Sequence, residues 1–155
     1  MKQNRLLQNA LTWLLIYLSA VLVKYRIGYL GYLNLSDAFI IALLAEEPII
    51  GLLIAGSACA AADITLSYEY YSFATFLIKG VEGWLICQGK RRKTNYNGLS
   101  LLALAVMVGG YGITSALVFG PDVLEPSLIL NMVQAAAAFA VSSLIRILLN
   151  RLSRK

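Results

Sequence analysis

Long apolar stretches, separated by short polar segments, follow one another along the whole chain. They cover residues 5–23, 36–45, 49–66, 72–88, 99–119 and 125–149. A transmembrane helix needs about 20 apolar residues, so six of them leave almost no chain for a soluble domain. The pattern predicts an all-α fold: one integral membrane domain over residues 1–155, built as a bundle of six transmembrane helices.

Turn-forming residues mark the connections between these helices. Residues 24–35 form an outer loop rich in glycine and tyrosine. Ser36 or Asp37 is a suitable cap for the second helix, which is short for a full span. Pro48 suits the first turn of the third helix, and residues 120–122 break the chain after the fifth.

Composition and charge support a membrane location and give it an orientation. Hydrophobic residues make up 59% of the chain and charged residues only 14%, against about half and a quarter in a soluble domain. Most cations lie at ends that we expect on one side: Lys2, Arg5, Lys90, Arg91, Arg92, Lys93, Arg146, Arg151, Arg154 and Lys155. The positive-inside rule then places both termini in the cytoplasm. Topology explains the basic runs, so we expect a lipid bilayer and no nucleic acid as partner.

Little in the chain suggests catalysis or metal binding. Histidine, the commonest metal ligand and general base, does not occur in it. The two cysteines, Cys59 and Cys87, lie in apolar stretches, where we expect them to be buried and inert. We therefore expect no metal, no cofactor and no catalytic residue.

Small residues recur every four positions on the third helix, at Gly51, Ala55 and Cys59, and Asp63 continues the series. This spacing lets helix backbones approach closely in lipid. Ordinary helix packing is the simpler interpretation, and a sliding interface for a partner protein is the alternative.

Polar side chains inside four of the stretches fall in the half of the bundle that we expect to face outward: Asp63, Thr75, Lys79, Glu82, Ser127, Asn131 and Gln134, with Asp37 near the start of the second helix. A charge within a span is costly and usually faces a cavity or a counter-ion. Lys79 and Glu82 are three residues apart and share a helix face, with Asp63 within plausible reach of Lys79.

Two interpretations of these polar residues remain open. Lys79 with Asp63 or Glu82 could be an ion pair that only fixes helix register. The whole set favours a small-molecule site, because carboxylate, ammonium, amide and hydroxyl groups converge from four helices. The formal charges of Asp37, Asp63, Lys79 and Glu82 sum to −2, which suits a neutral or cationic ligand better than a phosphorylated one. The outer tyrosines predict an interfacial belt, although one or two of them could stack on a flat ring in the pocket.

Five segments carry motifs in a fixed order along the chain. They are residues 31–38 (GYLNLSDA), 56–63 (GSACAAAD), 75–83 (TFLIKGVEG), 110–111 (GY) and 131–134 (NMVQ). Together they resemble the substrate-binding S components of energy-coupling-factor (ECF) vitamin transporters. The nearest group is the one associated with riboflavin, or with hydroxymethylpyrimidine and pyridoxine.

The resemblance implies a six-helix fold with an outward-facing pocket. The binding residues it implies are those at the motif positions: Asn34, Asp37, Asp63, Thr75, Lys79, Glu82, Tyr111, Asn131 and Gln134. It also implies a vitamin substrate, a membrane coupling subunit and two cytoplasmic ATPase subunits, in the plasma membrane of a prokaryote. The chain itself would be no enzyme, because the partners hydrolyse ATP and no Walker motif occurs here.

The first helix departs from the family pattern. Many S components carry an Ala-x-x-x-Ala face there for docking, whereas Ala10 is followed four residues later by Leu14. We therefore expect docking to use Ala10 together with Gly51 and Ala55.

A different class of function is also compatible with the buried charges. Asp63, Lys79 and Glu82 could form the proton relay of an ion-coupled secondary transporter. The small size of the chain and the lack of an inverted repeat count against this alternative.

Overall fold

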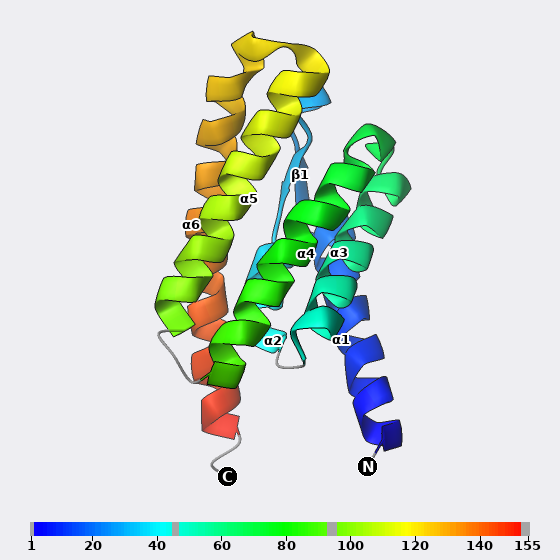
Figure 1. Ribbon diagram of the computed structural model, residues 1–155, viewed down its shortest axis with the longest axis vertical. Helices are drawn as coiled ribbons and strands as arrows, with labels where there is room; N and C mark the ends of the chain where they lie inside the picture. The colour runs from blue at the N-terminus through cyan, green and yellow to red at the C-terminus, as the bar shows by residue number, and fades with distance from the viewer. Residues whose placement is uncertain (1, 45–46, 93–95, 153–155) are drawn as a thin grey trace.

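The computed structural model describes residues 2–44, 47–92 and 96–152, and almost all of this chain is helical (Figure 1). Its helices are α1 Lys2–Leu22, α2 Ser36–Leu43, α3 Pro48–Thr65, α4 Glu69–Arg92, α5 Tyr96–Phe119 and α6 Leu124–Leu152. The prediction of an all-helical fold is confirmed. The expected helix end at residue 45, and the basic residues Lys93, Arg154 and Lys155, lie outside the described residues.

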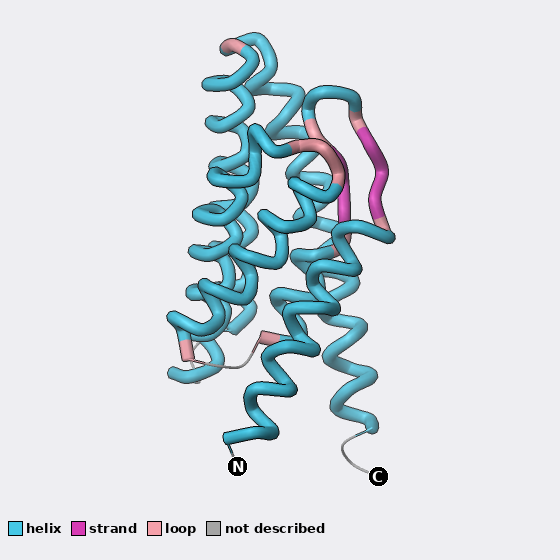
Figure 2. The backbone as a smooth tube through the Cα atoms, turned by 90° about the vertical axis from the view of Figure 1, so that its right-hand side faces the viewer, coloured by secondary structure: helices cyan, strands magenta, loops and turns pink. Residues whose placement is uncertain are grey.

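The segment expected to be a plain loop contains a small β-hairpin. Strands β1 Lys24–Arg26 and β2 Tyr32–Asn34 pair antiparallel, with Tyr25 opposite Leu33. A short 3₁₀ helix, Gly28–Leu30, joins the two strands, and Gly28 and Gly31 supply the positive φ angles of 56° and 110° that this tight connection requires. Figure 2 shows the hairpin in magenta at the end of the bundle away from the chain termini.

The helices run beside one another, with the start of α1 and the end of α6 at the same end of the bundle (Figure 1). Helix α3 packs on α4, α4 on α5, and α5 on α6, while α2 packs against α1 and α6. The apolar core lies between these helices and includes Ile16, Ile40, Ile86 and Met107. The short helix α2 therefore fills the middle of the bundle.

Length and charge decide which helices qualify as membrane spans. Four segments of the described chain are long and apolar enough to cross a membrane: Asn4–Leu22, Pro48–Thr65, Tyr96–Phe119 and Pro121–Leu152. Helix α4 has 24 residues but carries charges in its interior. Helix α2 has only 8 residues, about 12 Å of helix, and does not cross a hydrocarbon core of about 30 Å. The expected count of six transmembrane helices is therefore not confirmed, because α2 by itself is too short to be one of them.

The small residues of α3 serve packing within the chain. A Cβ atom added to Gly83 of α4 would lie 2.4 Å from the backbone oxygen of Gly51 and 2.8 Å from the Cβ atom of Ala55. Gly51 and Ala55 are buried, so they offer no surface to a partner protein. Of the three residues expected to dock a partner, only Ala10 is exposed, and burial argues against that role for Gly51 and Ala55.

We expect Gly83→Ala to lower the free energy of unfolding by about 1–3 kcal/mol, because the backbone of α3 has to move away from α4. Thermal unfolding of the purified protein in detergent measures this loss. Gly109→Ala is the matched control, since nothing lies within 4 Å of a Cβ atom at that helical position. Equal melting temperatures for the two variants would contradict the packing described here.

Candidate ligand-binding site

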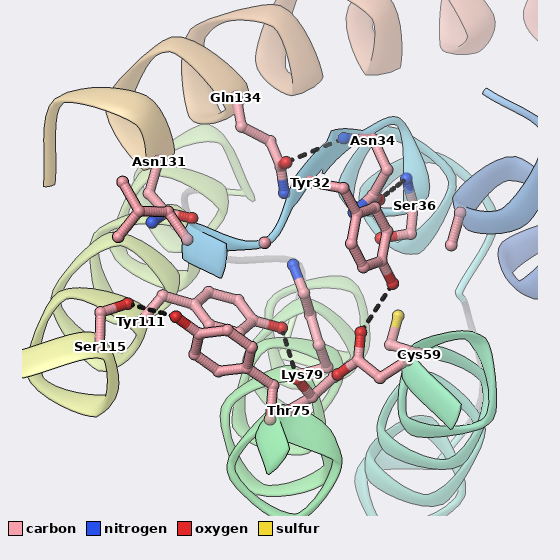
Figure 3. Close-up of a pocket in the computed structure, with 15 residues that line it drawn as sticks. Tyr32, Asn34, Ser36, Cys59, Thr75, Lys79, Tyr111, Ser115, Asn131 and Gln134 are labelled. Atoms are coloured by element: carbon pink, nitrogen blue, oxygen red, sulfur yellow. Dashed lines mark hydrogen bonds between the residues drawn. The ribbon is translucent and has the colours of Figure 1, made fainter. Parts of the chain in front are cut away.

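A cavity lies where the end of the hairpin meets the helices, with walls from α3, α4, α5 and α6 (Figure 3). It encloses about 470 Å³ of empty space, a volume that includes the space open to solvent at its mouth. Seven of the nine residues predicted to bind substrate line it: Asn34, Asp63, Thr75, Lys79, Tyr111, Asn131 and Gln134.

The two other predicted residues lie behind the cavity wall and hold Lys79. Its ammonium group donates to Asp37 Oδ1 of α2 and, over 3.3 Å, to Glu82 Oε2 one turn along α4. Lys79 is 1% exposed, and both carboxylates are fully buried. A buried charge that loses its partner is strongly destabilising. This triad therefore fixes α2 against α4 and sets the position of Lys79 in the cavity.

Gln134 of α6 connects the triad to the hairpin. Its Nε2 donates to Asp37 Oδ2 over 2.6 Å, and its Oε1 accepts from the backbone N–H of Asn34 over 2.9 Å. Asn34 Oδ1 in turn accepts from the backbone N–H of Ser36 over 2.8 Å. The predicted caps are thus wrong: Ser36 and Asp37 lie within the first turn of α2, and Asn34 supplies the side-chain oxygen at its start.

Asp63 is held by the hairpin rather than by Lys79. The Tyr32 hydroxyl donates to Asp63 Oδ1 over 2.7 Å. Burial, and then the charge of Asp63, raise the pKa of Tyr32, so the phenol stays protonated and remains a donor. Among the described residues, Asp63 Oδ2 and Ser36 Oγ are buried without a hydrogen-bond partner. Both residues line the cavity, so a bound ligand has an acceptor and a hydroxyl available to it.

Tyrosine rings form one wall of the cavity. Tyr111 donates to Thr75 Oγ1 over 3.0 Å, and Tyr71 shares a hydrogen bond of 2.8 Å with Ser115. The centroids of the two rings are 6.2 Å apart, and Lys79 Nζ lies 5.5 Å from that of Tyr111. Hydrogen bonds at the hydroxyl ends hold both rings in place, leaving aromatic surface on which a flat ring can stack.

The remaining outer tyrosines tie the hairpin to the start of α4. Tyr68 donates to the backbone oxygen of Gly28 over 3.0 Å, and Tyr70 to that of Tyr29 over 3.1 Å. Among the tyrosines of the hairpin, Tyr25 and Tyr29 expose more than half of their surface, so these two are available for an interfacial belt. The tyrosines thus hold the hairpin beside the cavity.

Several residues that line the cavity were not predicted from the sequence to bind a ligand. They are Tyr32, Ser36, Cys59, Tyr71 and Ser115. Tyr32 and Ser36 lie within the GYLNLSDA motif, which could have indicated them. Cys59 lies four residues before Asp63, on the same helix face. No local pattern distinguishes Tyr71 from its neighbours, because its orientation depends on how α4 packs against α5.

Direct contacts join two of the three residues considered for a proton relay, but not the third. Lys79 contacts Glu82, whereas the hydrogen bond recorded for Asp63 among the described side chains comes from Tyr32. The ion pair considered between Lys79 and Asp63 is therefore replaced by the pair between Lys79 and Asp37.

Comparison with known proteins identifies the class to which this fold and cavity belong. A family model described as "ECF-type riboflavin transporter, S component" matches residues 3–151, nearly the whole chain. The chain belongs to this family of membrane-embedded transporter subunits, and the predicted resemblance is confirmed.

Two relatives show partial similarity. The thiamine precursor transporter HmpT of Lactococcus lactis subsp. cremoris (strain MG1363) is 31% identical over 99 residues, which cover 64% of this chain and 57% of HmpT. The match thus spans less than two thirds of that relative. An uncharacterized protein in gap 3' region of Pyrococcus woesei is 30% identical over 115 residues, covering 72% of this chain and 77% of that protein.

We expect Lys79→Met to lower the free energy of unfolding by about 3–5 kcal/mol, because two buried carboxylates lose their counter-ion. Unfolding of the ligand-free protein in detergent measures the effect. Lys24→Met is the control, since Lys24 is exposed on β1. Adding Glu82→Gln to Lys79→Met should recover part of the loss, and an unchanged stability of Lys79→Met would show that the triad is not needed for folding.

Proposed function

We propose that this protein is the substrate-capture subunit of an ATP-driven ECF-type vitamin importer. It binds a small, unphosphorylated heteroaromatic vitamin or vitamin precursor in the cavity between the hairpin and the helices. One observation carries the proposal: the cavity combines a fixed ammonium group with a buried carboxylate oxygen that has no hydrogen-bond partner among the described residues, beside fixed tyrosine rings.

The charges of the site favour a ligand that donates hydrogen bonds. With all four groups ionised, Asp37, Glu82 and Asp63 outweigh Lys79 and leave a formal charge of −2. An added phosphate would meet two uncompensated negative charges in a region of low dielectric. A neutral or protonated ring with an amino group instead satisfies Asp63 Oδ2.

Hydroxymethylpyrimidine is the first ligand to test. It has one flat ring, an exocyclic amine that can donate to Asp63, and ring nitrogens that can accept from Lys79. The name of HmpT, a thiamine precursor transporter, supports this choice. The family description names riboflavin, and pyridoxine is a further heteroaromatic candidate, so both belong in the same binding assay.

The partners follow from this role. A membrane coupling subunit and two cytoplasmic ATPase subunits supply the energy, so that this chain is not an enzyme. The excess of cations near the two chain ends supports an orientation with both termini in the cytoplasm of a prokaryote. The exposed Ala10 remains the docking candidate on α1. The cavity, at the opposite end of the bundle, then faces the exterior.

We expect Asp63→Asn to weaken hydroxymethylpyrimidine binding by roughly tenfold to a hundredfold, the worth of a hydrogen bond to a charged acceptor. Isothermal titration of the purified subunit measures the change. Asp122→Asn is the matched control, because Asp122 is exposed in the connection between α5 and α6.

Two results would contradict this proposal. One is a wild-type protein that binds none of hydroxymethylpyrimidine, pyridoxine and riboflavin. The other is equal affinity of the Asp63→Asn and Asp122→Asn variants, which would place the ligand away from Asp63. Uptake that continues without ATPase partners and stops with an uncoupler would instead favour an ion-coupled transporter.

A further inference from the structure

A second cluster of charged side chains lies near the end of the bundle that carries the chain termini. We call Lys90, Tyr96 and Arg146 the Tyr96 cluster. Lys90 lies in the last turn of α4, Tyr96 begins α5, and Arg146 lies in the final third of α6. Lys90 Nζ is 5.5 Å and Arg146 Cζ is 4.6 Å from the centroid of the Tyr96 ring. Two cations from two helices therefore share one aromatic ring.

The described residues provide no carboxylate for either cation. Lys90 Nζ donates to the backbone oxygen of Ala42 over 3.1 Å, and Arg146 Nη2 donates to Ser143 Oγ over 3.3 Å. The ion pair described at this end of the bundle joins Arg91 and Glu47 instead. Arg146 Nε is buried and has no hydrogen-bond partner in the described chain.

Structural roles explain only part of this cluster. Lys90 and the Tyr96 hydroxyl bond to backbone oxygens in the last turn of α2, where carbonyl groups lack partners within the helix. Contact with the ring stabilises both cations. Neither role provides an acceptor for Arg146 Nε, and a buried donor without an acceptor is unfavourable. The cluster therefore has the charge and the free donor to hold an anion.

We propose that the Tyr96 cluster binds the phosphate group of an anionic phospholipid. The planar guanidinium group of Arg146 suits phosphate oxygens, and Lys90 adds a second charge. Cationic side chains that converge from two helices near the membrane surface are suited to such headgroups. The neighbouring parts of α5 and α6 expose apolar side chains, among them Leu102 and Ile147. A lipid can lay its acyl chains along these side chains, which a free phosphate ion cannot do.

The bound lipid would join three helices. Its phosphate bridges α4 and α6, and both contacts converge on the ring at the start of α5. The Tyr96 hydroxyl continues this connection to Ile41 in α2, the helix that carries Asp37 at its other end. The site is separate from the cavity, so it does not depend on which vitamin the protein binds.

Native mass spectrometry tests the proposal on the full chain in mixed phosphatidylglycerol and phosphatidylcholine. We expect phosphatidylglycerol to be retained, and Arg146→Gln to weaken its binding roughly fivefold, the effect of one cation near a charged lipid surface. Arg151→Gln, further along the same helix at an exposed position, should change retention much less. Lys90→Met tests the same site if Arg146→Gln does not fold, and should also weaken retention about fivefold.

Three results would overturn the proposal. Equal losses for Arg146→Gln and Arg151→Gln would indicate a diffuse surface charge. Equal retention of phosphatidylcholine would exclude recognition of an anion. Displacement of phosphatidylglycerol by millimolar inorganic phosphate would assign the site to a soluble anion. Titration with hydroxymethylpyrimidine runs in parallel, and the Arg146→Gln variant should bind it as the wild type does.

Discussion

The structure depends on how an ammonium group is accommodated inside an apolar bundle. Lys79 has almost no contact with solvent, and its charge is tolerated because Asp37 and Glu82 contact it directly. Glu82 comes from the same helix, but Asp37 has to be brought to α4 by a separate element. This requirement gives a physical reason for the short helix α2 in the middle of the bundle. Asp37 lies in the first turn of α2, at the depth of Lys79, whereas a helix that crossed the whole bundle would not begin there.

The same ion pair organises the candidate site. Gln134 bonds both to Asp37 and to the backbone of Asn34, so the charged triad is linked to the hairpin beside the cavity. The hairpin then places Tyr32 against Asp63. The polar side chains that line the cavity are thus held by hydrogen bonds to other polar groups. The side chains that would contact a ligand are therefore in position before the ligand binds. Such preorganisation lowers the cost of ordering the site on binding.

Helical periodicity explains how much of this could be predicted from the sequence. Asn131 and Gln134 are three residues apart, so a helix had to bring them to one face, and the structure places both in the cavity with Lys79. The partner of Lys79 could not be predicted, because spacing within one helix does not tell which neighbouring helix supplies the carboxylate. A small-residue face such as Gly51 and Ala55 fits a helix of the same chain as well as a partner protein. The strands of the hairpin, with three residues each, are too short to show an alternating pattern.

An experimental structure of the protein saturated with hydroxymethylpyrimidine tests the account most directly. We predict one ligand between the hairpin and the Tyr71–Tyr111 wall, with its amino group at Asp63 Oδ2 and Lys79 still paired with Asp37. A ligand bound outside this cavity, or a Lys79 side chain that leaves both carboxylates and points into lipid, would contradict the central claim.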